Sequence, residues 1–225
     1  RHRGILLKNA KNNAILLGVI YVVLSYLCLN DLKIQSTVNQ FFQSSFGWFV
    51  FLMYFINCGG VVTRAMFYHC DHAMLRYNFY RNPEVVVGLF KKRLKTIILV
   101  NLLPAFVMAF GNLFLMFITG DISIVPSLLM FIFLISLSVF FSVHHLVMYY
   151  LLQPYNSETE TRSKSYRIAN FATYAIFIYP VLYFDATIPM SLFIIGWLVL
   201  SIVYVIIALP IVYKYAPKMF KLSYE

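Results

Sequence analysis

The chain consists largely of long apolar runs that contain no lysine, arginine, aspartate or glutamate. A helix needs about 20 mostly apolar residues to cross the hydrocarbon core of a bilayer, and the runs have roughly that length. They are continuous, whereas a membrane β-barrel would show alternating segments of about ten residues. The pattern predicts an all-α membrane protein, one transmembrane domain over residues 1–225, with six membrane-spanning helices: 13–29, 46–63, 97–118, 126–153, 168–184 and 188–213.

The charged residues between the runs predict the orientation of the chain. Of the 18 lysines and arginines, all except Lys33 fall in residues 1–12, 64–96 and 154–167 or in the C-terminal tail. These segments alternate with the remaining loops, and basic residues beside membrane spans stay in the cytoplasm. We therefore expect both termini in the cytoplasm and a multi-pass protein of the plasma membrane.

Composition excludes several classes of protein. The chain is 61% hydrophobic and only 12% charged, whereas about a quarter of a soluble domain is charged. A globular fold of this length could not hide so much apolar surface from water, so soluble and disordered proteins are excluded. The net charge of +10 predicts contact with anionic lipid headgroups, and no nucleic-acid partner is expected. Cys28, Cys58 and Cys70 lack the spacing of metal ligands, so no metal site is expected.

Familiar catalytic motifs are absent from the sequence. It has no glycine-rich phosphate loop, no His-Glu-x-x-His zinc motif and no Gly-x-Ser-x-Gly nucleophile elbow. We therefore expect no catalytic residue and no ATP bound by a phosphate loop. The predicted spans also lack the carboxylates and amines that ion-driven carriers usually keep there. A transporter of this kind would draw its energy from a partner.

The segment 64–96 is the longest one expected in the cytoplasm. Asp71 is a plausible N-cap for a short helix that ends at Arg81. This helix mixes aromatic, methionine and arginine side chains, which suit a groove on a partner protein. The residues expected to dock there are Asp71, His72, Met74, Leu75, Arg76, Tyr77, Phe79 and Arg81.

A second helix is expected after residues 82–84, which are Asn, Pro and Glu. Asn82 fits the N-cap, Pro83 the first helical position and Glu84 the positive helix end. This helix can lie at the headgroup level and then run into the third span, or it only anchors the segment at the membrane surface. Residues 1–12 are either an interfacial amphipathic helix before the first span or a simple basic flank.

Several residues inside the spans mark possible hinges or a translocation route. Paired glycines allow close packing or a local break, and prolines form fixed kinks or bending points. Serines form a polar stripe that either bonds across helices or lines a route, and two adjacent histidines either relay protons or make hydrogen bonds. Tyrosines near span ends, such as Tyr149 and Tyr150, are typical of an aromatic belt. The candidates are Asn57, Gly59, Gly60, Pro104, Ser138, Ser142, His144, His145 and Pro180.

Three short stretches resemble a known family. They are residues 68–84 (YHCDHAMLRYNFYRNPE), 90–95 (FKKRLK) and 101–104 (NLLP). They resemble permease subunits of ATP-binding-cassette exporters of Gram-positive bacteria, in the type-2 permease class. Within that class, the exporters of phenol-soluble modulins, which are amphipathic peptide toxins, are the most similar group. Many members have a large outer element between the last two spans, whereas only residues 185–189 separate them here.

The resemblance implies a function. A cytoplasmic coupling helix between spans two and three would dock on a separate ATPase subunit, present in two copies, which binds ATP and Mg²⁺. A second permease copy or a close paralogue would complete the route, and this chain would need no cofactor. Its mostly apolar and aromatic walls would suit a hydrophobic or amphipathic cargo, such as a peptide. The alternatives are a membrane-integral enzyme or sensor subunit, and a channel or secondary carrier.

Overall fold

The computed structural model describes residues 3–45, 47–75, 82–120, 124–155, 164–183 and 189–220, and the side chains of all of these except 3–6 and 180–183. The described part is helical and contains no strand. Its elements are α1 Arg3–Asn30, α2 Leu32–Ser44, α3 Trp48–Ile56, α4 Gly59–Met66, the π-helical turn η1 Phe67–Asp71, α5 His72–Met74, α6 Pro83–Thr119, α7 Ile124–Leu152, α8 Lys164–Tyr183 and α9 Met190–Met219.

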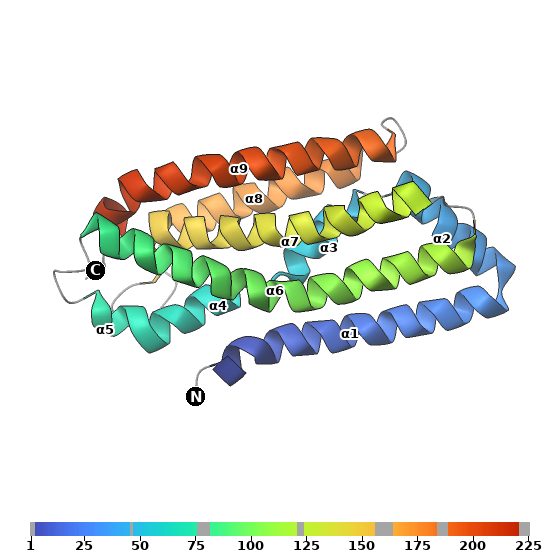
Figure 1. Ribbon diagram of the computed structural model, residues 1–225, viewed down its shortest axis with the longest axis horizontal. Helices are drawn as coiled ribbons and strands as arrows, with labels where there is room; N and C mark the ends of the chain where they lie inside the picture. Colours follow the sequence, from blue (N-terminus) through green and yellow to red (C-terminus); the bar gives the residue numbers. More distant parts are fainter. Residues whose placement is uncertain are drawn as a thin grey trace.

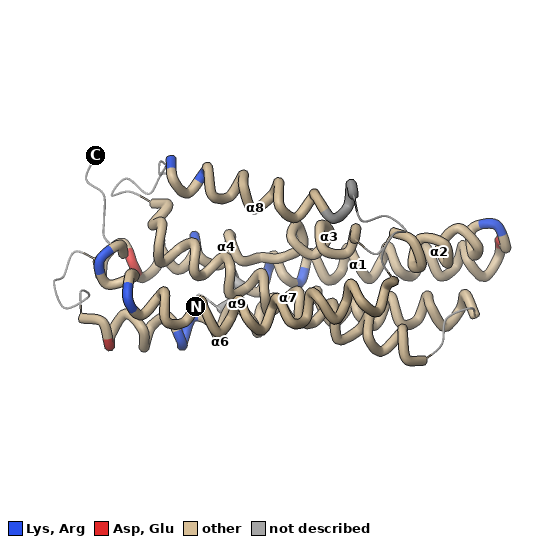
Figure 2. Tube along the Cα trace, turned by 90° about the horizontal axis from the view of Figure 1, so that it is seen from above, with Lys and Arg blue, Asp and Glu red and all other residues tan. Residues whose placement is uncertain are grey.

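The helices form a bundle along one long axis (Figure 1). Helix α7 lies at its centre and packs against α6 and α9, while α1 packs on the outer side of α6. The beginning of α1 and the end of α9 point toward the same end of the bundle. Lysines and arginines gather toward that end, which we call the basic end, and Lys33 lies at the opposite end (Figure 2).

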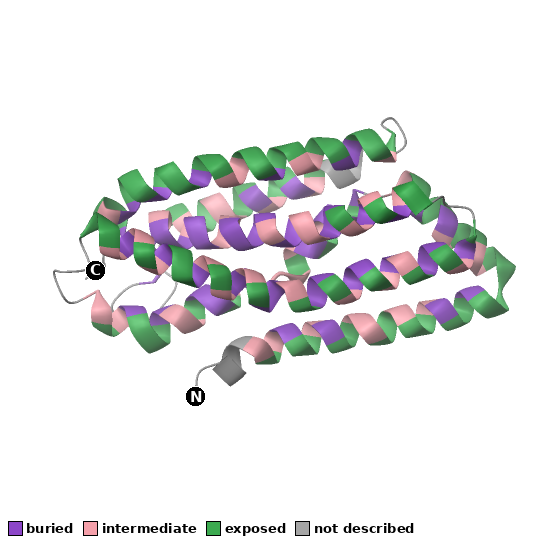
Figure 3. Ribbon diagram, viewed as in Figure 1, coloured by how far each residue is buried: buried purple, intermediate pink, exposed green. Residues whose placement is uncertain are grey.

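Five helical stretches are long and apolar enough to cross a membrane, which confirms the prediction of a multi-pass helical protein. Their outward faces, above all those of α1 and α9, are exposed, whereas α7 is mostly buried (Figure 3). The predicted fifth span, 168–184, coincides with α8, which is not among the five. Six spans and the orientation therefore remain predictions. The five stretches are Leu7–Asn30, Trp48–Met74, Pro83–Thr119, Ile124–Leu152 and Met190–Met219.

The predicted cytoplasmic segment 64–96 is helical over most of its described residues, and its place relative to the membrane stays a prediction. The helical chain continues past Thr63, the expected end of the second span, because α4, η1 and α5 carry it on to Met74. Helix α6 begins at Pro83 and runs without interruption into the third span. The Asn82 side chain caps it by accepting a hydrogen bond from the Glu84 backbone N–H (3.2 Å), which confirms the predicted start of this helix.

The structure also bears on the predictions for both ends of the first span. Residues 3–12 are continuous with the first span, because α1 runs unbroken from Arg3 to Asn30, and whether they lie at the membrane surface stays a prediction. The expected outer loop after α1 contains helix α2, whose N-cap Asp31 accepts a hydrogen bond from the Lys33 backbone N–H. Phe42 of α2 stacks on Phe49 of α3, and this apolar contact folds α2 back onto the bundle.

Candidate functional site

The second apolar run is broken in the middle of its length. Helix α3 ends at Ile56 and α4 begins at Gly59, with an extended backbone at Asn57. We call Asn57 and Cys58 the helix break. At membrane depth no water is present to satisfy free backbone groups, so such a break is tolerated only where protein groups or a cavity supply partners.

Side chains from two other helices satisfy the backbone at the break. Asn13 of α1 donates from Nδ2 to the carbonyl oxygen of Ile56 (2.9 Å). Asn101 of α6 accepts at Oδ1 a hydrogen bond from the Cys58 N–H (2.8 Å). The break is thus held from both sides by asparagine side chains.

The same Asn101 side chain joins α6 to α7. Its Nδ2 donates to Ser142 Oγ (2.8 Å) and to Asn57 Oδ1 (3.2 Å). Ser138 Oγ donates to the Asn101 carbonyl (3.2 Å), three residues before the buried Pro104 that interrupts the hydrogen bonding of α6. The two serines therefore make hydrogen bonds across helices, which was one of the two interpretations of the serine stripe.

Asn57 occupies the centre of the break and is not fully bonded. Its Oδ1 accepts from the Gly59 N–H (2.8 Å) as well as from Asn101. Its buried Nδ2 has no hydrogen-bond partner among the described residues. Leaving a donor unpaired at such a place costs about 1–3 kcal/mol. The break therefore holds one spare donor for an acceptor oxygen.

Gly59 provides the close contact between the break and α7. A Cβ atom at this position would lie 2.5–2.6 Å from ring and Cβ atoms of His145, whereas one on Gly60 would meet nothing within 4 Å. The His145 ring is also stacked on Tyr54 of α3, with ring centroids 6.0 Å apart. His145 thus packs against both sides of the break, and only a glycine fits beneath it.

His144 points toward the other side of α7, as expected for adjacent residues of a helix. Its Nε2 lies 3.1 Å from Thr173 Oγ1 of α8 and its Nδ1 lies 3.0 Å from the Tyr204 hydroxyl of α9. The Thr173 hydroxyl donates its proton to the Ala169 carbonyl (2.7 Å), so it can only accept from His144. His144 Nε2 therefore carries the ring proton, and Nδ1 accepts from the Tyr204 hydroxyl. Both ring nitrogens are occupied in tying three helices together.

A second buried polar group lies at the basic end, where four side chains form what we call the basic-end cluster. Arg93 of α6 donates to one carboxylate oxygen of Asp71, and the Tyr149 hydroxyl donates to the other. Arg93 also donates to the Tyr150 hydroxyl (2.8 Å). Asp71 is fully buried and Arg93 is 8% exposed, so this ion pair is shielded from water.

The cluster corrects two predictions. Asp71 does not cap a helix, because its carboxylate is taken up by Arg93 and Tyr149, and η1 continues directly into α5. Tyr149 and Tyr150 are not part of an aromatic belt, since they are 1% and 0% exposed.

Tyr155, just after α7, covers Phe67 with ring centroids 4.8 Å apart, and burial raises the pKa of its phenol to about 12.

The other predicted coupling residues divide into two groups. His72 packs edge-on against Phe67, and Met74 and Leu75 lie half-buried against the apolar core of the basic end. These three side chains thus contact their own chain, and a role in docking stays a prediction. Arg76, Tyr77, Phe79 and Arg81 lie outside the described residues, as does most of the predicted helix over 71–81.

The structure brings four of the nine predicted route and hinge residues together at the break. Asn57, Gly59, Ser142 and His145 lie there with Asn101, whereas Gly60 points into open space. Pro180 lies within α8, away from the break, and its side chain is not described. In the described part, no group of three or more His, Cys, Asp or Glu side chains is arranged to hold a metal ion.

Sequence reasoning missed Arg93, Asn13 and Asn101 as structural centres. Asn13 and Asn101 carried a usable signal, because an amide in an apolar run must find a partner at membrane depth. Arg93 lies in the basic run 90–95, and nothing in that run marks it as the one cation whose side chain turns inward.

Comparison of the chain with family models, with curated proteins and with solved structures returned no match.

Replacing Gly59 by alanine tests the close contact at the break. We expect Gly59→Ala to destabilise the protein by about 1–3 kcal/mol, because the new methyl group overlaps the His145 ring. Gly60→Ala is the matched control, and it should be neutral because its methyl group meets no atom. The measurement is the free energy of unfolding in mixed micelles. Equal effects of the two substitutions would contradict the contact.

A double-mutant cycle tests the basic-end cluster. Asp71→Leu or Arg93→Met alone should each cost about 3–5 kcal/mol, because either leaves a buried charge without its partner. The double variant should lose clearly less free energy of unfolding than the sum of the losses in the two single variants. Lys92→Met, which removes an exposed neighbouring charge, should change stability by less than about 0.5 kcal/mol. Additive losses would show that the two charges do not interact.

Proposed function

We propose that this chain is the membrane-spanning permease subunit of an ATP-driven exporter of hydrophobic or amphipathic cargo. The observation that carries the proposal is the break between α3 and α4, whose backbone groups are held by side chains of α1 and α6. Discontinuous helices of this kind recur at the substrate sites of transporters, where they combine polar backbone with movable half-helices. An enzyme or sensor subunit would need convergent reactive groups, and the groups at the break are amides, hydroxyls and one histidine.

The break supplies a hinge in this proposal. The half-helix α4 continues through η1 and α5 to the basic end, so a displacement applied there reaches the break along one rod. The Asp71–Arg93 ion pair fastens the same rod to α6, and Tyr149 fastens it to α7. An ATPase subunit that moves residues 72–75 would thus pull on three helices together.

The surroundings of the break suit an amphipathic cargo. A groove of about 370 Å³ lies between α3 and α8, and its lining is mostly aromatic, with Arg167 and Asn170 as the polar groups. Asn170 accepts a hydrogen bond from the Tyr54 hydroxyl (3.2 Å), and Tyr54 in turn stacks on His145 at the break. The groove would therefore take apolar side chains of a peptide, with Arg167 available to an anionic group. Its lining residues are Tyr54, Phe55, Tyr166, Arg167, Asn170, Phe171 and Tyr174.

Reconstituted transport tests the proposal. The chain, purified with an ATPase subunit that copurifies with it, is placed in vesicles with ATP outside, and uptake of a fluorescent amphipathic helical peptide is measured. We expect ATP-dependent uptake that Asn101→Leu reduces at least tenfold, because the variant leaves the Cys58 N–H unpaired and frees the break from α6. Asn12→Leu, an exposed change beside Asn13, is the matched control and should transport normally.

Two results would count against the proposal. If no nucleotide-hydrolysing partner copurifies, or if uptake does not depend on ATP, the protein is not an ATP-driven exporter. Normal ATP-driven uptake by a folded Asn101→Leu variant would agree with an exporter but contradict the proposal that the break is its hinge.

A further inference from the structure

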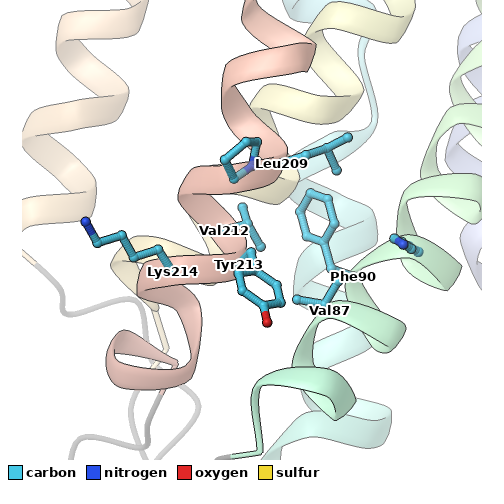
Figure 4. A pocket seen from close by; sticks show the side chains of 8 residues that line it. Val87, Phe90, Leu209, Val212, Tyr213 and Lys214 are labelled. Atoms are coloured by element: carbon cyan, nitrogen blue, oxygen red, sulfur yellow. The ribbon is translucent and has the colours of Figure 1, made fainter.

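A groove at the basic end has the features of a lipid-binding site. It lies between the first turns of α6 and the last turns of α9 and has a volume of about 690 Å³. Figure 4 shows Val87 and Phe90 of α6 facing Val212 and Tyr213 of α9 across it. Phe90 and Val212 are buried and form its floor, while Leu209 and Tyr213 form exposed walls.

Two lysines border this groove, one from each helix. Lys91 of α6 and Lys214 of α9 are both exposed and belong to its lining. The Lys214 side chain extends from α9 away from Val87 and Phe90 (Figure 4), with its ammonium group 5.4 Å from the centre of the Tyr215 ring. Its four flexible carbons allow the ammonium group to leave that ring and reach the groove mouth. The exposed Tyr213 side chain lies on the side of α9 that faces Val87 (Figure 4). The apolar trough is therefore bordered by Lys91 and the Tyr213 hydroxyl, and by Lys214 once its side chain turns from Tyr215 toward the groove.

The depth of the groove matches the headgroup region of a bilayer. Helix α6 has 37 residues and is thus about 55 Å long, well beyond the roughly 30 Å of hydrocarbon. Its charged residues all lie before Thr96, and the last charge-free stretch of α9 ends at Lys214. Lys91 and Lys214 therefore lie where the apolar runs give way to charge, which is the level of lipid phosphates.

We propose that this groove binds one anionic phospholipid of the leaflet at the basic end. The lipid phosphate pairs with Lys91 and with Lys214, whose ammonium group turns from Tyr215 to reach it. An acyl chain lies against Val87, Leu209 and Pro210. The charge of the border selects an anionic lipid over a zwitterionic one, because juxtamembrane lysines attract anionic headgroups. The site is independent of the proposed transport function, since it lies on α6 and α9 and includes no residue of the helix break.

The experiment counts lipids retained on the purified protein by native mass spectrometry, in micelles that contain equal amounts of phosphatidylglycerol and phosphatidylcholine. We expect one phosphatidylglycerol to be held about tenfold more tightly than phosphatidylcholine. The variant Lys91→Gln/Lys214→Gln should lose this preference. The matched control Lys92→Gln/Lys218→Gln removes two charges from the same helices outside the groove lining and should retain the preference.

Two further arms separate a lipid from a free phosphate. Val87→Trp keeps every lysine but fills the trough, so it should lose the bound lipid while the circular dichroism and melting temperature stay unchanged. Millimolar inorganic phosphate should fail to displace the lipid. The proposal is overturned if the control variant loses the preference equally, if phosphatidylcholine binds as well, or if phosphate displaces the lipid and Val87→Trp has no effect.

Discussion

The structure depends on the need to satisfy backbone hydrogen bonds where no water reaches them. An unpaired backbone group in hydrocarbon costs several kcal/mol, and the break in the second apolar run leaves the Ile56 carbonyl and the Cys58 N–H without partners in their own helices. The requirement places Asn13 in α1 and Asn101 in α6, each at the position where its amide reaches the break. Asn101 then needs partners for its own Nδ2, and Ser142 of α7 supplies one. One interruption of a helix thus fixes how α1, α6 and α7 meet around it.

Helix α6 connects this central network to the basic end. Asn101 and Arg93 both belong to it, and each is buried against α7. The chain that leaves the break as α4 returns to α6 through the Asp71–Arg93 pair. The rod from α4 to α5 is therefore fixed to α6 at two points, which makes it suited to carry a movement between the basic end and the break.

Much of the fold follows from the sequence, and much of the site does not. Charge-free apolar runs predict a multi-pass helical protein, and Asn82-Pro83-Glu84 predicts the start of α6, because both are local patterns. The role of Asp71 is not determined by its local sequence. The residue fits an N-cap by sequence, but in the structure it is buried against Arg93, 22 positions later in the chain. The paired glycines indicated a break or close packing, and the structure has both, yet only the His145 ring shows why Gly59 differs from Gly60.

The most direct test of the account is amide hydrogen exchange at Cys58. The account holds that its N–H is protected by Asn101, although it lies outside any helix. In the native protein this amide should exchange as slowly as those of the neighbouring helices α3 and α4. In an Asn101→Leu variant it should exchange at least tenfold faster, while amides in the middle of α7 keep their rates. Fast exchange of Cys58 in the native protein, or an unchanged rate in the variant, would contradict the central role of Asn101.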